Sequence, residues 1–470
     1  MTSLSTPRAR GKNAFTVIAD SFLHDPGLPF ASVLDGEVIR RVFQEEEALF
    51  GQEDIFSTQL VLWAFLAQTL RDGKGVACAS AVADIATYLL QTGQRPPSGD
   101  TGAYCRARAK LKLRALQRLV RESAQQLEEQ APRGWLWKGR HTKLVDGFTF
   151  TMPDTPENQA AFPQIAEQRP GVGLPIARAC VVLSLATACV CDLAVGPCEG
   201  KETSESALLR GLLKVLEKND VVVFDRFYCS FLMLALLSLQ GVHVCARLHH
   251  RRPIDFRRGR RLGPGDHLIT WTRPKRPAWM TPEQYDEIPE TLTLREVQFQ
   301  VTVPGCRIET LTVITTLTDP TVYSRADIAE LYGFRWHAEL DIRQIKQTLH
   351  LDHVRCKTPE MVRRELWVTL LAYNLIRQVI ATSAAVHKKQ PRQLGFTLAC
   401  QSLLASWMLL ATGVCPDPQA LYHLLLARLA ANEVANRPGR IEPRVLKRRR
   451  HRYPLMQRSR AELQAELGKT

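Results

Sequence analysis

From about residue 34 to residue 129 the chain follows a helical pattern of hydrophobic positions. Apolar residues recur every three or four positions, and this spacing predicts helices at 38–50, 58–70, 78–90 and 113–127. The stretch 101–121 carries seven lysines and arginines on what reads as two consecutive helices. Such a pair is either a helix-turn-helix that lies in a DNA groove or a small bundle with one solvated basic face. We expect an all-helical, DNA-binding N-terminal domain at 1–135.

A change from helical to strand-like patterning begins at about residue 142. Helices are expected at 204–216 and 228–239, and strands are expected at 143–152, 176–185, 189–195, 220–224 and 242–248. The predicted order is three strands, a helix, a strand, a helix, a strand and then a long helix. This is the order of a ribonuclease-H-like α/β fold. We expect this catalytic core to comprise residues 142–248 and 320–355.

The long helix is predicted at residues 324–350. Ser324 and, three residues later, Asp327 form a capping-box-like start. An apolar stripe that must face a core consists of Ile328, Leu331, Ala338, Ile342, Ile345 and Leu349. A polar stripe beside it consists of Tyr332, Arg335, Glu339, Arg343 and Lys346. A carboxylate flanked by cations and a phenol suits a divalent metal next to a phosphate backbone, but ordinary ion pairs on an exposed helix give the same pattern.

The core is interrupted by a β-rich insertion at 249–319. Seven arginines within the fifteen residues 247–261 predict a DNA-facing loop, and three strand-like runs follow at 268–272, 293–303 and 308–317. Residues 356–470 predict a helical C-terminal region. Its basic tail, from residue 436, is either a DNA-contacting arm or a solubilising end.

The composition favours a nucleic-acid partner. The 470 residues carry a formal net charge of +15, and 45% of them are hydrophobic, as in a soluble globular protein with a polyanionic partner. The 12 cysteines show no Cys-x2-Cys spacing, which disfavours a zinc module. The N-terminus has no apolar signal-peptide region, and no apolar run is long enough to span a bilayer. We expect a cytoplasmic protein without a membrane partner.

Two aspartates occur where open α/β sheets place their chemistry. Asp146 lies within the first predicted strand, and Asp225 directly follows the buried run 220–224. Either residue alone reads as a turn former or a helix cap. With Glu339 they make three carboxylates in the order and on the element types that a two-metal phosphoryl-transfer site requires, because two adjacent divalent cations need several anionic oxygen ligands.

One spacing on the long helix, Tyr-x2-Arg-x3-Glu-x6-Lys, resembles the signature of a subgroup of the IS4-family DDE transposases; it is matched by Tyr332, Arg335, Glu339 and Lys346. Residues 145–164 and 224–230 resemble the family's two aspartate regions. The resemblance implies that Asp146, Asp225 and Glu339 are catalytic and bind two Mg²⁺ or Mn²⁺ ions. It also implies DNA contacts, for which the candidates are Tyr332, Arg335, Lys346, Arg343, Arg226, Tyr228 and Trp271. Trp271 is either a platform for a base flipped out of the duplex or a core tryptophan.

These inferences predict a transposase that cuts the ends of an insertion sequence and joins them to target DNA. The resemblance implies a hairpin intermediate, a homodimer on paired terminal inverted repeats, and a nucleoid-associated protein of a prokaryotic host. Two alternatives remain: a silent, domesticated repressor or inhibitor of transposition, and a nuclease that does not join strands. The segment GPCEGK at 196–201 departs from a phosphate-binding loop, so no use of ATP is expected.

Overall fold

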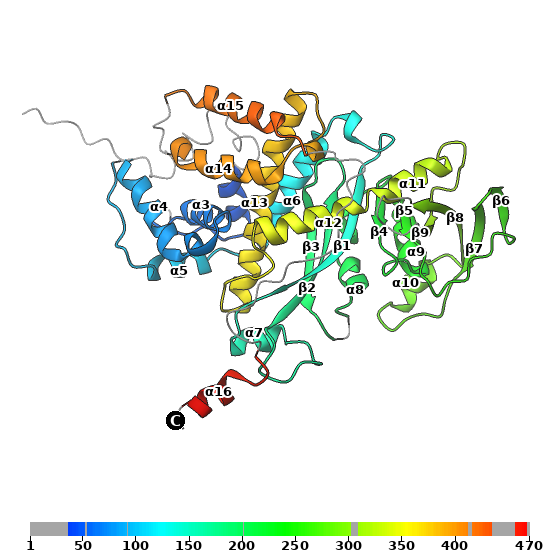
Figure 1. Cartoon of the computed structure of the whole chain (residues 1–470), viewed down its shortest axis with the longest axis horizontal. Coiled ribbons are helices and arrows are strands. Elements are labelled where there is room, and N and C mark those ends of the chain that lie inside the picture. The colour runs from blue at the N-terminus through cyan, green and yellow to red at the C-terminus, as the bar shows by residue number, and fades with distance from the viewer. Residues whose placement is uncertain are drawn as a thin grey trace, which may run out of the picture. The chain divides into compact units, whose positions relative to one another are not determined.

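The computed structural model describes residues 36–51, 54–91, 93–200, 202–301, 309–411, 416–434 and 456–467. Two compact units make up the chain (Figure 1). One combines Met1–Gln130, Gln344–Leu351 and Glu360–Val434; the other combines Ala131–Arg343, Asp352–Pro359 and Ala435–Thr470. Helices that we expected in separate N-terminal and C-terminal regions therefore share a unit. Of the predicted basic tail, residues 436–455 lie outside the described residues.

The first unit is helical in its described residues. Its elements are α2 (Gly36–Glu45), α3 (Thr58–Thr69), η1 (Gly73–Val76), α4 (Cys78–Gln91), α5 (Gly102–Ala109), α6 (Leu113–Glu129), η4 (Gln344–Thr348), α13 (Pro359–Val386), η5 (Pro391–Gln393), α14 (Phe396–Ala411) and α15 (Pro418–Ala431). The long helix α13 is tied to α6, because the buried Asn374 amide donates to the carbonyl of Val120 and to the hydroxyl of Ser123, both at 3.2 Å. No helix within the described ranges has the length and apolar character needed to cross a membrane.

The second unit is built on one mixed sheet of nine strands. Their order across the sheet is β3 (Val190–Pro197), β2 (Ile176–Ser184), β1 (Thr142–Thr151), β4 (Val221–Phe224), β5 (His243–Arg247), β9 (Glu309–Thr315), β8 (Thr291–Val301), β7 (Asp266–Thr272) and β6 (Arg260–Gly263). Strand β4 runs parallel to both of its neighbours, β1 and β5, and the other neighbouring pairs are antiparallel. The expected α/β class is confirmed.

The predicted insertion continues this sheet. The chain leaves after β5 and returns as β9, which pairs directly with β5 through Cys245 and Thr315. Three of the insertion's strands were expected from their apolar alternation. The fourth, β6, was missed because its sequence, RRLG, has no hydrophobic alternation and pairs only at the edge, with β7.

Short helices complete the second unit. They are η2 (Arg133–Trp135), α7 (Pro156–Ala161), α8 (Glu205–Arg210), η3 (Leu213–Val215), α9 (Phe231–Leu239), α10 (Pro282–Glu287), α11 (Arg325–Gly333), α12 (Trp336–Arg343) and α16 (Arg460–Leu467). Helix α8 packs on β2 and β3, and α12 packs on β1. The predicted helix at 204–216 is shortened to α8, which Ser204 caps at one end and which ends at Gly211.

The prediction of one uninterrupted helix at 324–350 was wrong. The structure contains α11, α12 and a π-helical segment, η4 (Gln344–Thr348). Between α11 and α12 the amides of Arg335, His337 and Ala338 bond to carbonyls three residues earlier, which tightens the turn after the weak helix former Gly333. The capping box at Ser324 is confirmed, and the whole predicted apolar stripe is buried. Arg335 therefore lies at the bend between two helices.

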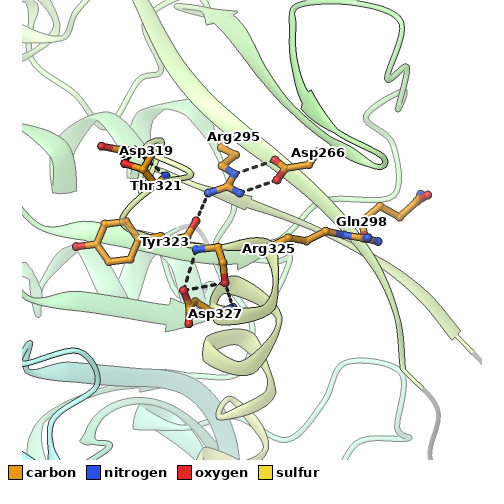
Figure 2. A network of polar contacts seen from close by, with 9 residues as sticks. Asp266, Arg295, Gln298, Asp319, Thr321, Tyr323, Arg325 and Asp327 are labelled. Carbon is orange, nitrogen blue, oxygen red and sulfur yellow. Dashed lines mark hydrogen bonds and ion pairs between the residues drawn. The ribbon is translucent and has the colours of Figure 1, made fainter.

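The start of α11 is fastened to β8 (Figure 2). Arg295 of β8 is fully buried and donates to both carboxylate oxygens of Asp266, at 2.8 and 2.6 Å. Its third bond, at 2.6 Å, goes to the carbonyl of Tyr323, next to the cap residue of α11. Arg325, the first residue of α11, donates to the carbonyl of Gln298, also on β8. The insertion thus holds the helix pair that carries Glu339.

The segment before β1 holds the same helix start from another direction. The ring of Trp137 stacks on Tyr323 with 5.8 Å between ring centroids, and Arg140 donates to the Tyr323 hydroxyl at 2.9 Å. Lys138 forms an ion pair with Asp327 at 3.0 Å. Contacts from two parts of the sheet unit therefore fix where α11 begins.

We predict that Arg295→Ala lowers the free energy of unfolding by about 3–5 kcal/mol, because it leaves the buried Asp266 carboxylate without a partner. Urea denaturation at neutral pH measures the change. The control is Arg257→Ala, which removes an exposed arginine paired with Asp255 and should leave stability nearly unchanged. Wild-type stability of Arg295→Ala would contradict this assignment of the buried pair.

Candidate active site

Asp146 lies on β1, near the middle of the sheet. Strand β1 pairs with β2 on one side and with β4 on the other. The Asp146 side chain is 18% exposed, and its Oδ1 accepts a bond from the backbone N–H of Gly147 at 2.9 Å. The first predicted acid is therefore a partly buried carboxylate on a well-anchored strand.

Asp225 follows directly after β4, the parallel neighbour of β1. The register pairs Val145 with Phe224, so each aspartate occupies the next position along its strand. The Asp225 Oδ1 atom accepts the N–H of Arg226 at 2.7 Å. The sheet brings the two predicted aspartates side by side, one within β1 and one directly after β4.

Glu339 reaches the same place from α12, which packs on β1. The Arg335 guanidinium contacts Asp146 Oδ2 through Nη1, at 3.4 Å, and contacts Glu339 Oε1 through Nη2. One cation is therefore shared by two of the three predicted catalytic carboxylates.

The main electrostatic feature of the site is the burial of the Asp146 carboxylate. Burial raises the pKa of Asp146 from 3.8 to about 6; the Gly147 N–H and Arg335 oppose this rise, whereas Glu205 and Glu339 add to it. A carboxylate with a pKa near 6 is ionised at neutral pH, but its ionised form is less favourable in the folded protein than in the unfolded chain.

The donor atoms suit a divalent cation, since Mg²⁺ and Mn²⁺ prefer carboxylate oxygens. Among the described residues, however, no group of three or more His, Cys, Asp and Glu side chains is arranged to hold a metal ion. The guanidinium of Arg335 contacts one oxygen of Asp146 and one oxygen of Glu339.

The predicted DNA-contacting cations differ in their exposure. Arg343, at the end of α12, is exposed, and Lys346 lies beyond it in η4, a segment of the helical unit. Arg226 is half-buried, with its guanidinium 5.4 Å from the ring centroid of Phe227, which is 62% exposed. Arg226 and Phe227 directly follow Asp225, so this loop presents a cation and an aromatic ring beside the site.

The predicted DNA-contacting aromatic residues are buried. The Tyr228 hydroxyl points to Glu205 Oε2, at 3.1 Å, and not to solvent. Tyr332 is buried on α11, and burial raises its phenol pKa. Trp271 is buried with the Arg252 guanidinium 3.5 Å from its ring centroid. Trp336, on α12, is 54% exposed and is the more accessible ring for stacking.

Sequence reasoning missed Glu205. It is the first residue of α8, where an acid after a serine cap is the ordinary beginning of a helix. Its carboxylate nevertheless lies against Gly147 and raises the pKa of Asp146. The glycine after Asp146 was the only available signal, and a glycine within a strand is equally typical of a bulge or a tight bend.

The site combines three acids: one lies on a central strand, one directly follows the parallel neighbour of that strand, and one lies on a helix that packs on the central strand. This arrangement defines a class of metal-dependent phosphoryl-transfer enzymes. A family model described as "Transposase DDE domain" matches residues 137–375, just over half of the chain. The chain belongs to the DDE transposases, and within them to the IS4 family, which are metal-dependent, DNA-cleaving enzymes. The family expected from the sequence is confirmed.

The chain is 28% identical to transposase InsG of insertion sequence element IS4 from Escherichia coli K12 over 440 residues, 92% of this chain and 94% of that protein. It is 39% identical to the transposase of insertion sequence element IS421 from Escherichia coli over 61 residues, 13% of this chain and 16% of the relative. A cryo-EM structure of the piggyBac transposase synaptic complex with hairpin DNA aligns with a TM-score of 0.41 and 9% identity, covering 92% of this chain and 88% of that one. A likeness at this level carries no inference about mechanism.

We predict that Asp146→Asn stabilises the protein at pH 8 in EDTA, by at most about 3 kcal/mol. The folded protein binds a proton on Asp146 more tightly than the unfolded chain does, so the stability of the wild type falls as pH rises from about 4 to about 6. The neutral variant avoids this loss, and its advantage should vanish below about pH 4. Urea denaturation across this pH range measures it.

The matched control for this prediction is Asp286→Asn, which removes an exposed aspartate on α10 and should not change the pH dependence. If Asp146→Asn were less stable than the wild type at pH 8, the ionised Asp146 carboxylate would not destabilise the folded protein, contrary to this prediction.

Proposed function

We propose that this protein catalyses cut-and-paste transposition of an insertion sequence, with two Mg²⁺ or Mn²⁺ ions per active site. The observation that supports this proposal best is that three acids from distant segments of the chain converge. The register sets Asp225 beside Asp146, and Arg335 joins Asp146 to Glu339. Carboxylates in this number are what two divalent cations and a phosphodiester require.

The fold that supports this function is a ribonuclease-H-like core. Two observations support this core. Five strands follow the order β3-β2-β1-β4-β5, and β1, β4 and β5 run parallel. The helix that carries the third acid, α12, packs on β1. The core comprises 142–248 and 320–355, the insertion 249–319, and the helical regions 1–135 and 356–470. The first helical region binds specific DNA.

Asp146, Asp225 and Glu339 would hold the metal ions, which would supply the activation of water and then of the freed 3′-OH for in-line attack on a phosphodiester. The three side chains must be ionised to do so, and a pKa of about 6 leaves Asp146 ionised at neutral pH. Arg335, once released from the acids, has the charge and the planar donors to bind a phosphate group. A hairpin at the element end precedes strand transfer.

Double-stranded DNA is the partner, both as terminal inverted repeats and as target. The net charge of +15 favours it, and the relatives are named as transposases of insertion sequence elements. Arg343, Arg226 and Lys346 contact the phosphate backbone. A homodimer holds the two ends together in the bacterial cytoplasm, at the nucleoid.

We predict that Asp146→Asn, Asp225→Asn and Glu339→Gln each lower cleavage of element-end DNA by about a thousand-fold or more while DNA binding is kept. Each change removes one anionic metal ligand and keeps the shape of the side chain. Gel-based cleavage and strand-transfer assays with Mg²⁺, together with gel shifts, measure the two properties. Glu360→Gln, an exposed acid at the start of α13, is the control and should be fully active.

The same assays on the wild type separate the alternatives. Binding without cleavage indicates a repressor or inhibitor, cleavage without joining indicates a nuclease, and joined products support the transposase. Full cleavage by Glu339→Gln would show that the active site has been assigned to the wrong residues.

A further inference from the structure

One carboxylate at the site has no part in the function proposed so far. Glu205, the first residue of α8, lies directly against Gly147, the residue after Asp146. A Cβ atom at position 147 would come within 2.4 Å of Glu205 Cδ and 2.5 Å of Oε1. Glycine at this position therefore leaves the room that the carboxylate occupies. Strand β1 accommodates an acid from α8 next to its own aspartate.

Contacts with the loop after Asp225 hold Glu205 in this place. The Tyr228 hydroxyl donates to Glu205 Oε2 at 3.1 Å. The neighbouring Ser206 hydroxyl donates to the carbonyl of Phe227 at 2.9 Å. Glu205 thus lies against the strand of the first aspartate and is bonded to the loop that follows the second.

Tyr228 is suited to orient this carboxylate. Its ring is buried, and burial raises the pKa of its phenol, a rise to which Cys180, Glu205 and Asp146 add. The phenol therefore stays protonated and remains a donor. It engages Oε2, while Oε1 is the oxygen nearer to the space above Gly147.

The charge of Glu205 is not needed for this hydrogen bond. A glutamine side chain has the same length and also accepts a bond from a phenol. Within the described residues Glu205 has no ion-pair partner, whereas Arg335 contacts both Asp146 and Glu339. Glu205 adds to the rise in the pKa of Asp146, and carboxylates whose charges affect one another in this way are concentrated at functional sites.

We propose that Glu205 is a fourth acidic residue of the active site, and that it supplies a carboxylate oxygen to the divalent cation bound at Asp146, directly or through one water molecule. Tyr228 acts as its positioning residue. This inference rests on the proposed function, because it presupposes that Asp146, Asp225 and Glu339 bind metal ions.

The test is Mn²⁺ binding by the full-length protein, followed through the electron paramagnetic resonance signal of free Mn²⁺. We expect Glu205→Gln to weaken Mn²⁺ affinity by about tenfold or more, with a parallel rise in the Mn²⁺ concentration that gives half-maximal cleavage. Tyr228→Phe keeps every carboxylate and should weaken affinity by a smaller factor. Glu217→Gln removes an exposed acid between α8 and β4 and should behave as the wild type.

Thermal unfolding in EDTA shows whether the variants fold. Glu205→Gln should melt at or above the wild-type temperature, because it removes a repulsive charge. Wild-type Mn²⁺ affinity in Glu205→Gln would overturn the proposal, and wild-type affinity in Tyr228→Phe would overturn the positioning role of Tyr228. The proposed function would still stand if Asp146→Asn and Glu339→Gln lost Mn²⁺ binding and cleavage; it would fail as well if these two variants kept both.

Discussion

The burial of one carboxylate close to others is the constraint on which this part of the protein depends. Burial is the main cause of the raised pKa of Asp146, and Glu205 and Glu339 add to the rise. In water three such groups would separate, because their mutual repulsion and the loss of hydration both favour distance. They stay together here because each is attached to a different, well-anchored element: a central strand, a short capped helix and a helix packed on that strand. Arg335 offsets part of the repulsion and is placed to do so by the bend between α11 and α12.

The stability that permits this arrangement lies away from the acids. The helix pair that carries Glu339 is fixed at its beginning, where the buried Arg295 joins Asp266 to the Tyr323 carbonyl (Figure 2). Trp137 and Arg140 hold the Tyr323 side chain from the segment before β1. Because these contacts do not involve the acids, the side chains of the site can change partners without loss of the helix. The protein thus combines partly buried acids that lie close together with stable packing at the start of α11, which does not involve those acids.

The sequence predicted those features that depend on neighbours along the chain. Apolar runs located the strands, and the rule that open α/β sheets carry their chemistry on neighbouring strands placed Asp146 and Asp225 together. It did not predict the break before Trp336, because the buried stripe continues on both sides of it and the helical period alone gives no sign of a bend. Nor did it predict that Tyr228 faces Glu205. That contact joins residues 23 positions apart through the fold, and an aromatic residue beside a catalytic acid reads equally well as buried or exposed.

The continuity of the sheet limits how the insertion can move. We expected the insertion as a separate β-rich part, but β9 pairs with β5 over Cys245, Ala246 and Arg247, and β5 pairs in turn with β4, the strand that precedes Asp225. The Leu248 amide adds a further bond, to the Thr312 carbonyl at 2.9 Å. Displacement of the insertion as a body would break these backbone bonds in a buried part of the sheet, where unpaired amide and carbonyl groups are costly. DNA held by the arginine-rich segment 247–261, which the sequence predicts to face DNA, would therefore be held in a fixed relation to the two aspartates. The freedom to adapt to a substrate lies instead in side chains such as Arg335.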